Sequence, residues 1–256
     1  MRVAVIGGTG ELGSLVVAEL AARGDEVRAV SRRAPPAGKL PAGVEHASAD
    51  LTSGDGLVAA LDGVEVVLDA ANDRRRARDV LVGGTLRLVA AEADAGVRHH
   101  VAISIVGCDR VPQPYYKAKV AQEQALASGA VPWTLLRATQ FHALVAGAFA
   151  ATARVRVLPQ IRVPLQPLDT AVVARRLAEL VHAEPGGRVA DLAGPRVETL
   201  AELADAWRAH HGRRLLALRL PPRALGKGAG EMAAGALTDP GTATDGPTFA
   251  QWLASR

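Results

Sequence analysis

The first thirteen residues, Met1 to Gly13, constrain the fold of this chain more than any other stretch. Val3 to Ile6 form a short apolar run, which is typical of a strand buried on both faces. Glycines follow at once in the spacing G-x-x-G-x-x-G, and helix-forming residues continue from Leu12 to Arg23. Glycines let a pyrophosphate approach backbone N–H groups closely, and a helix N-terminus supplies donors and a partial positive charge. An ordinary strand–helix turn is the alternative, but it does not account for three glycines at fixed spacing. The stretch therefore predicts the first strand, turn and helix of a dinucleotide-binding fold.

Composition limits the class of protein. A chain of 256 residues is long enough for one large α/β domain, or for a domain with a cap. Hydrophobic residues make up 49% of the chain, which excludes a disordered protein. The net charge is +4, but 26 acidic residues are interspersed among the basic ones, so we expect no nucleic-acid partner. We interpret the arginine run from Arg74 to Arg78 as a solvated helix start. The single cysteine, Cys108, excludes an intrachain disulfide framework.

No apolar run reaches the length of a transmembrane helix, and the chain starts on a predicted core strand. We therefore expect a cytoplasmic protein without a signal peptide or a membrane partner. We expect it to act on a small molecule as a monomer or homodimer.

The end of the second predicted strand, Val27 to Ser31, indicates which dinucleotide binds. An NAD-binding unit usually places an acidic residue here to hold the ribose hydroxyls. This chain has Arg32 and Arg33 instead, and guanidinium groups pair well with a phosphate. The pattern predicts NADP(H) in preference to NAD(H), with Arg32 as the main contact and Ser31 as a helper. The alternative is two solvated loop arginines.

Strands and helices alternate through the first half of the chain, which predicts an α/β fold with a doubly wound parallel sheet. Further strands are expected at 44–48, 64–68 and 101–105, and helices at 52–61 and 75–95. Gly83 and Gly84 interrupt the second of these helices, which indicates close packing on the sheet or the cofactor.

Two loops that follow strands are further candidates for cofactor contacts. Asp50 is placed to meet the adenine edge, next to Leu51. The small residues Ala70 and Ala71, with Asn72, would let the cofactor lie over the end of the strand before them.

A second motif lies in Tyr115-Tyr116-Lys117-Ala118-Lys119. Tyr115 and Lys119 are four residues apart and so share one face of a helix. An ammonium beside a phenol favours the phenolate and lowers the pKa of the tyrosine, which then serves as a proton donor or acceptor. Lys119 is also a candidate ligand of the nicotinamide ribose, and Ser104, at a strand end, is a candidate donor to a substrate oxygen. The alternative is a surface helix with a partly buried tyrosine.

Taken together, these motifs resemble the NmrA-like group of atypical short-chain dehydrogenases/reductases. The resemblance rests on Val5–Gly13, Ser31–Arg33, Tyr115 with Lys119, and the stretch Trp133–His142. It implies a Rossmann-like fold and an NADP-type cofactor, with Thr139 beside the nicotinamide and His142 close to it. Ser104 lies eleven residues before Tyr115 and departs from the pattern of the group. The implied contacts in the glycine loop are Gly7, Thr9, Gly10, Glu11, Leu12 and Gly13.

The last part of the chain is predicted to form a smaller C-terminal substrate-binding cap. We expect a single domain over 1–256, with a dinucleotide-binding core at 1–140. Residues 141–256 are mostly cap, with parts that return to the core. Helices are expected at 141–153, 170–182, 200–211 and 248–254, strands at 154–158, 188–193 and 215–220, and a mobile flap at 226–246.

The cap is expected to offer an apolar pocket at the carboxyl ends of the strands. Candidate substrate contacts are Val106, Cys108, Phe141 and His142, and the alternative for His142 is a purely structural role. The histidine pairs, His99-His100 and His210-His211, have no third ligand nearby, so we interpret them as polar element termini and expect no metal.

The sequence thus predicts an NADPH-dependent oxidoreductase that reduces a small, largely apolar carbonyl, enone or quinone. Tyr115 with Lys119 favours this enzyme. The alternative is an NADP(H)-binding sensor without turnover, which the placement of Ser104 favours.

Overall fold

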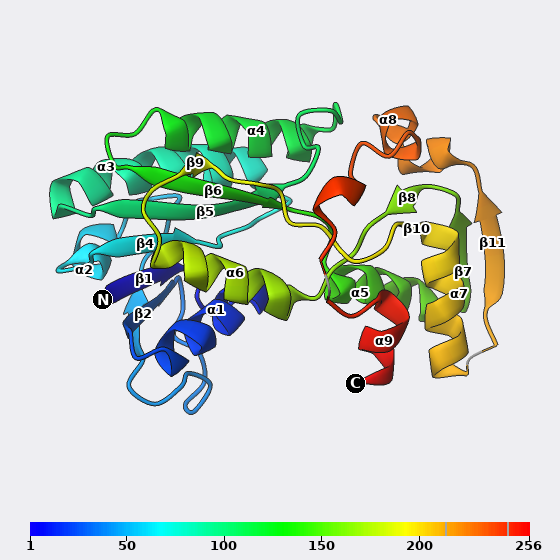
Figure 1. The fold of residues 1–256 in the computed structure, drawn as a ribbon, viewed down its shortest axis with the longest axis horizontal. Helices are drawn as coiled ribbons and strands as arrows, with labels where there is room; N and C mark the ends of the chain where they lie inside the picture. Colours follow the sequence, from blue (N-terminus) through cyan, green and yellow to red (C-terminus); the bar gives the residue numbers. More distant parts are fainter. Residues whose placement is uncertain (213, 245) are drawn as a thin grey trace. The chain divides into compact units, whose positions relative to one another are not determined.

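A computed structural model describes residues 1–212, 214–244 and 246–256 (Figure 1). The described chain forms two compact units, each assembled from segments that are separate in the sequence. The first unit contains Met1–Ser104, Ala118–Leu136 and Val173–Val189. The second unit contains Ile105–Lys117, Arg137–Val172 and Ala190–Arg256.

The first unit is built on a parallel sheet of seven strands, in the order β3-β2-β1-β4-β5-β6-β9. The sheet starts at β1 and is extended first on one side and then on the other, so the doubly wound topology predicted from the sequence is confirmed. Three residues of β1 are fully buried and Ile6 is 3% exposed, as expected for a strand covered on both faces. The strands are β1 (Arg2–Ile6), β2 (Glu26–Ser31), β3 (Glu45–Ser48), β4 (Val66–Asp69), β5 (His99–Ile105), β6 (Trp133–Ala138) and β9 (Gly187–Arg188).

Helices cover both faces of this sheet. In Figure 1, α3 and α4 lie on one side of the sheet and α1 and α6 on the other. The helices are α1 (Glu11–Ala22), α2 (Leu57–Leu61), the π-helix η1 (Arg78–Gly83), α3 (Gly84–Ala95), α4 (Pro114–Ala127) and α6 (Thr170–Val181). The N–H of Ala171 donates to Asp169 Oδ1 at 3.1 Å, and this bond caps the first turn of α6.

Two helices differ from their predicted bounds. The helix expected at 52–61 begins only at Leu57, because Asp50 Oδ1 accepts hydrogen bonds from the backbone and hydroxyl of Thr52 and turns the chain there. The helix expected at 75–95 starts at Arg78 with a π-helical turn. A Cβ on Gly84 would lie 2.9 Å from the Cβ of Leu51, so close packing is the reason for this glycine.

The second unit holds two small sheets and its own core. Strands β7 (Val157–Ile161) and β11 (Leu216–Leu220) pair in parallel, and β8 (Pro164–Leu165) pairs antiparallel with β10 (Glu198–Thr199). The core packs Phe149, Trp207 and Phe249 together. The helices are α5 (His142–Ala153), α7 (Leu200–His211), the 3-10 helix η2 (Pro222–Leu225), α8 (Ala229–Ala233), the 3-10 helix η3 (Pro240–Thr242) and α9 (Phe249–Ala254).

The local predictions for this unit hold in part. The helix expected at 200–211 is α7, and a capping box of Thr199 and Glu202 stabilises its start. The strand expected at 154–158 lies at 157–161. In the first unit, the strand expected at 188–193 is replaced by the shorter β9, which ends at Arg188. The stretch predicted as a flap at 226–246 contains α8 and η3. Within that stretch, Asp245 lies outside the described residues.

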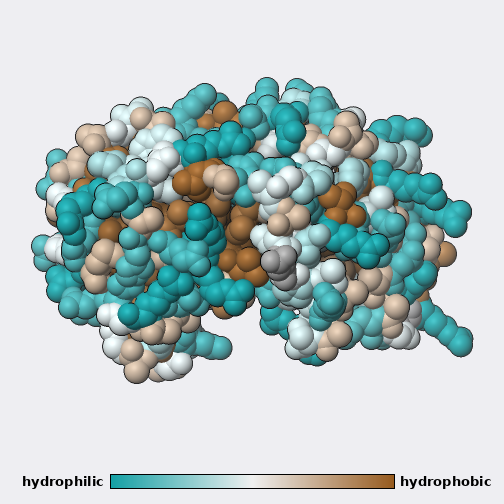
Figure 2. All heavy atoms as spheres, viewed as in Figure 1, coloured by the Kyte–Doolittle hydropathy of each residue, from teal (hydrophilic) through white to brown (hydrophobic). Residues whose placement is uncertain are grey.

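Hydrophilic side chains cover most of the molecular face in Figure 2, with smaller apolar areas among them. Across residues 1–212, 214–244 and 246–256, no helix has both the length and the apolar character that a membrane crossing requires.

Candidate functional site

The glycine loop between β1 and α1 combines tight packing with one open position. Gly7 has a φ of +74°, and a Cβ there would lie 3.1 Å from the backbone of Ala70 and Ala71. A Cβ on Gly13 would lie 2.1 Å from the carbonyl oxygen of Gly7, so this glycine lets α1 sit against the turn. Gly10 is the N-cap of α1 without a side-chain cap, and a Cβ there would meet only one atom within 4 Å, at 3.2 Å. The glycine loop therefore lies against the loop after β4 and is open at Gly10.

The loop after β2 carries the two arginines predicted to choose the cofactor. Ser31 Oγ donates to the carbonyl of Arg33 at 2.9 Å and lies 3.0 Å from His46 Nε2. Ser48 Oγ donates to the carbonyl of Arg32 at 3.2 Å. The two serines thus fix the backbone of the arginine pair, and both arginine side chains are exposed.

A third arginine, Arg76, lies near the same two carboxylates as Arg32, those of Asp50 and Asp73. Hydrogen bonds from Thr52 lower the pKa of Asp50, and the charges of Arg32 and Arg76 lower it further. The backbone N–H of Arg76 donates to Asp73 at 2.9 Å, which is the main cause of the lowered pKa of Asp73, and the same two charges add to it. Arg76, which the sequence analysis assigned to a solvated helix start, thus shares the electrostatic surroundings of Arg32. This proximity is consistent with the topology, because Arg32 and Arg76 follow the two strands that flank β1, and the carboxyl ends of parallel strands lie at one edge of the sheet.

Lys119 is buried, with 3% of its surface exposed. Its Nζ donates to the carbonyl of Ile103 at 3.0 Å and to Oε1 of Gln122 at 2.8 Å. Gln122 Nε2 donates to Asp69 Oδ2 at 3.2 Å, and Asp69 Oδ1 accepts from the N–H of Ala71 at 2.9 Å. The ammonium is therefore linked to the loop after β4, which the sequence analysis singled out for the cofactor. Gln122 was not among the predicted site residues, although its spacing of three from Lys119 places both on one face of α4.

Tyr115 lies one helical turn before Lys119 on α4, as predicted. Its ring centroid is 5.6 Å from that of Tyr116, and the rings are tilted by 53°. Ser104 is buried at the end of β5, and its Oγ donates to Glu123 Oε1 at 2.5 Å. Its predicted bond to a substrate oxygen stays a prediction.

In the second unit, the hydroxyl of Thr139 forms hydrogen bonds to the backbone of two other segments. Its Oγ1 donates to the carbonyl of Gln166 at 2.5 Å and accepts from the N–H of Gly194 at 3.1 Å. Val106 and Cys108 are each 1% exposed, whereas Phe141 is half-buried.

His142 is fully buried in an aromatic cluster. Its ring centroid is 5.6 Å from those of Phe249 and of Trp252, and Nε2 lies 2.9 Å from the carbonyl oxygen of Pro247. Because a carbonyl only accepts, Nε2 carries the proton. Burial lowers the pKa of this histidine, although the bond to Pro247 opposes the shift. These surroundings favour a structural role over a substrate contact.

His99 and His100 start β5, in agreement with their interpretation as polar element termini, and both are buried. His100 Nδ1 lies 2.8 and 2.9 Å from the two carboxylate oxygens of Glu92, and His99 Nε2 lies 2.8 Å from Thr134 Oγ1. Burial alone would lower the pKa of His100, but the charge and hydrogen bond of Glu92 raise it above its ordinary value. Within the described ranges, no group of three or more metal-ligating side chains is placed to hold an ion.

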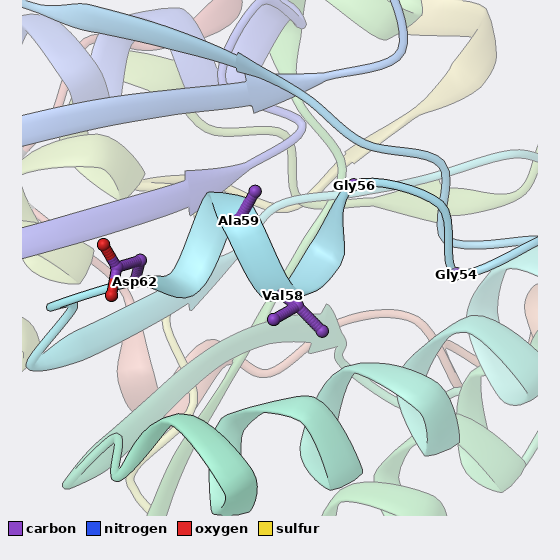
Figure 3. A pocket seen from close by; sticks show the side chains of 5 residues that line it. All are labelled: Gly54, Gly56, Val58, Ala59 and Asp62. Atoms are coloured by element: carbon purple, nitrogen blue, oxygen red, sulfur yellow. The ribbon is translucent and has the colours of Figure 1, made fainter.

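An open depression lies at the start of α2, lined by Gly54, Gly56, Val58, Ala59 and Asp62. Figure 3 shows that the side chains of Val58, Ala59 and Asp62 point in different directions from this short helix. The lining contains none of the residues predicted to bind the cofactor, and it holds one titratable group.

Comparison with known proteins identifies the family of this chain and structures with a similar fold. A family described as NAD(P)H-binding matches residues 7–183. The fold is similar to that of an NADPH-dependent quinone oxidoreductase from Escherichia coli complexed with NADPH, with a TM-score of 0.82 and 22% identity over 99% of each chain. It is also similar to Citrobacter sp. triphenylmethane reductase complexed with NADP(H), with a TM-score of 0.77 and 20% identity over 100% of each chain.

Among curated proteins, photosystem II assembly factor Ycf39 of Cyanophora paradoxa is 26% identical over 235 residues. The match covers 86% of this chain and 72% of that protein. The chain spans about half the length, or less, of further curated relatives that it matches.

Proposed function

Because this chain belongs to the NAD(P)H-binding family, we propose that it is an NADPH-dependent oxidoreductase that reduces a small, largely apolar carbonyl, enone or quinone. The observation that carries the proposal is the buried ammonium of Lys119, one helical turn from Tyr115. A buried ammonium is costly unless it is hydrogen-bonded, and this one is held by Ile103 and Gln122. A fixed ammonium one helical turn from a tyrosine favours the phenolate, and this supports a role for Tyr115 in proton transfer.

The residues of the glycine loop fit a dinucleotide. Gly10 leaves open space at the first turn of α1, where backbone N–H groups and the helix dipole favour a phosphate. The small residues Ala70 and Ala71 lie against Gly7. When bound, the nicotinamide cofactor supplies a hydride to the substrate.

We assign the choice of NADP(H) to guanidinium groups near the ends of β2 and β4. Arg32 and Arg33 take the place where an NAD-binding unit has an acid. Arg76 adds a positive charge that acts on the same carboxylates as Arg32. A charge-assisted bond from a guanidinium to a 2′-phosphate is the expected contact.

In the proposed reaction Tyr115 donates a proton to the oxygen that becomes negatively charged as the hydride arrives. Lys119 stabilises the phenolate that this transfer leaves. The hydroxyl of Ser104 donates a hydrogen bond to Glu123, so we assign Ser104 a role in holding α4 against β5.

The second candidate is an NADP(H)-binding sensor without turnover. Two observations favour it: the Ser104 hydroxyl donates to Glu123, and one matched relative is named as an assembly factor.

One experiment separates the two candidates. NADPH oxidation is followed by its near-ultraviolet absorbance against a panel of quinones, enones and ketones, while calorimetry measures NADPH binding to the same sample. We expect turnover with at least one class, and we expect Lys119→Met to impair it. Tight NADPH binding without turnover of any compound would contradict the enzyme and support the sensor.

A further inference from the structure

We propose that Gln122 is a positioning residue, which orients the Lys119 ammonium and couples it to the loop after β4. The inference deepens the proposed function, because it rests on the role given there to Lys119. Gln122 lies outside the motifs identified in the sequence. The proposed role follows from the hydrogen bonds of its side-chain amide.

The chemistry of its two partners fixes the orientation of that amide. An ammonium only donates, so the Gln122 atom 2.8 Å from Lys119 Nζ is the carbonyl oxygen. An ionised carboxylate only accepts, so the atom 3.2 Å from Asp69 Oδ2 is the NH2 group. All three side chains are at least 95% buried, with exposures of 3%, 5% and 1% for Lys119, Gln122 and Asp69. One neutral amide thus satisfies a buried cation and a buried anion at once.

The same chain of bonds continues into the predicted cofactor loops. Asp69 Oδ1 accepts from the N–H of Ala71, and the backbone of Ala71 lies against Gly7. Gln122 therefore links the Lys119 ammonium to the Asp69 carboxylate, which in turn accepts a hydrogen bond from the loop after β4. Loss of the amide should disturb Lys119 and the loop together, although Gln122 itself need not touch the cofactor.

The test removes both hydrogen bonds of Gln122 in one variant and only its donor in another. Gln122→Met has a similar volume and removes both bonds. Gln122→Glu keeps an acceptor for Lys119 but places a second carboxylate against Asp69. Asp69→Asn combined with Gln122→Glu exchanges the two groups: the new amide donates to the new carboxylate, the Lys119 acceptor is kept, and the net charge is unchanged. Gln124→Met, at an exposed position of the same helix, is the matched control.

Two readouts are measured on each folded variant. The first is the Nζ resonance of the lysine ammonium in ¹⁵N NMR without added cofactor. The chain has four lysines, so Lys119→Met identifies the signal. The second is the dissociation constant of NADPH by calorimetry. A role confined to stability would change the unfolding temperature and the Lys119 signal, and it would leave the dissociation constant of NADPH unchanged.

We expect Gln122→Met and Gln122→Glu to shift or broaden the Lys119 signal and to weaken NADPH binding about tenfold, as for the loss of a hydrogen bond to a charged group. The exchanged pair should restore both readouts to within about threefold, and Gln124→Met should change neither. An unchanged Lys119 signal or an unchanged NADPH dissociation constant in the single variants would overturn the proposal, as would an exchanged pair that behaves like Gln122→Glu alone. If Gln122→Met does not fold, the comparison of Gln122→Glu with the exchanged pair decides. If the wild type shows no NADPH turnover, the proposed function fails, and the ammonium signal together with the NADPH dissociation constant still decides the role of Gln122.

Discussion

Alanine at Gly13 and valine at Gly10 should damage two different properties of one loop. A Cβ on Gly13 would lie 2.1 Å from the carbonyl oxygen of Gly7 and 2.8 Å from its carbon. Ordinary contact requires roughly 1 Å more, and backbone atoms cannot rotate away. Overpacking of this kind costs about 2–3 kcal/mol, while alanine in a helix gains about 1 kcal/mol over glycine. The free energy of unfolding should therefore fall by about 1–2 kcal/mol.

At Gly10 we expect the opposite pattern: a small loss of stability and a large loss of NADPH affinity. Its φ of −78° suits any residue, and only one atom lies within 4 Å of the new Cβ. Gly10→Val should therefore fold with a loss of about 1 kcal/mol or less, as for a poorer N-cap. The side chain would occupy the place where a phosphate approaches the backbone. Each phosphate hydrogen bond lost should weaken NADPH binding about tenfold to hundredfold.

Urea unfolding and NADPH calorimetry on the same samples measure the two effects. Gly147→Ala is the control, because Gly147 lies in α5 with nothing within 4 Å of its Cβ position, and this variant should be slightly stabilised. The reasoning fails if Gly13→Ala unfolds at the same urea concentration as Gly147→Ala. It also fails if Gly10→Val binds NADPH within threefold of the wild type.

Three further outcomes are expected. Tyr115→Phe should lower turnover about 10²- to 10⁴-fold with an unchanged NADPH dissociation constant, and Tyr116→Phe should keep the wild-type rate; equal rates for the two would contradict the role of Tyr115. Arg32→Ala should reduce the preference for NADPH over NADH by about tenfold or more in parallel calorimetric titrations, and an unchanged ratio would contradict it. Burial lowers the folded-state pKa of His142 below its ordinary 6.5, so the unfolded chain takes up the proton first and stability should fall as the pH drops below that value. His142→Gln should reduce this slope in unfolding measurements between pH 7 and pH 5, and the exposed His210→Gln should leave it unchanged.

The parts of the fold that depend on short-range signals could be predicted from the sequence. The buried strand Arg2–Ile6, the glycine turn and α1 are adjacent in the chain, so their pattern is visible in one window. The pair Tyr115 and Lys119 could be predicted for the same reason, since helical spacing places both on one face.

The parts that depend on distant contacts could not. Asp69 and Gln122 meet across 53 positions, and no spacing rule connects them. The late start of α2 depends on whether the Asp50 side chain binds Thr52 or stays exposed, a choice that propensity does not determine. Burial of His99 and His100 follows from partners on α3 and β6, which only the folded chain identifies.

The segmented composition of the first unit has a consequence for synthesis on the ribosome. Strand β6 emerges with one edge open, because Thr134 and Leu135 pair with Gly187 and Arg188, which are made about fifty residues later. An open edge of a sheet is a template for pairing with another chain. A nascent or truncated chain that stops near residue 140 should therefore aggregate or recruit a chaperone, and this edge of β6 is covered only when the two-residue strand β9 leaves the ribosome.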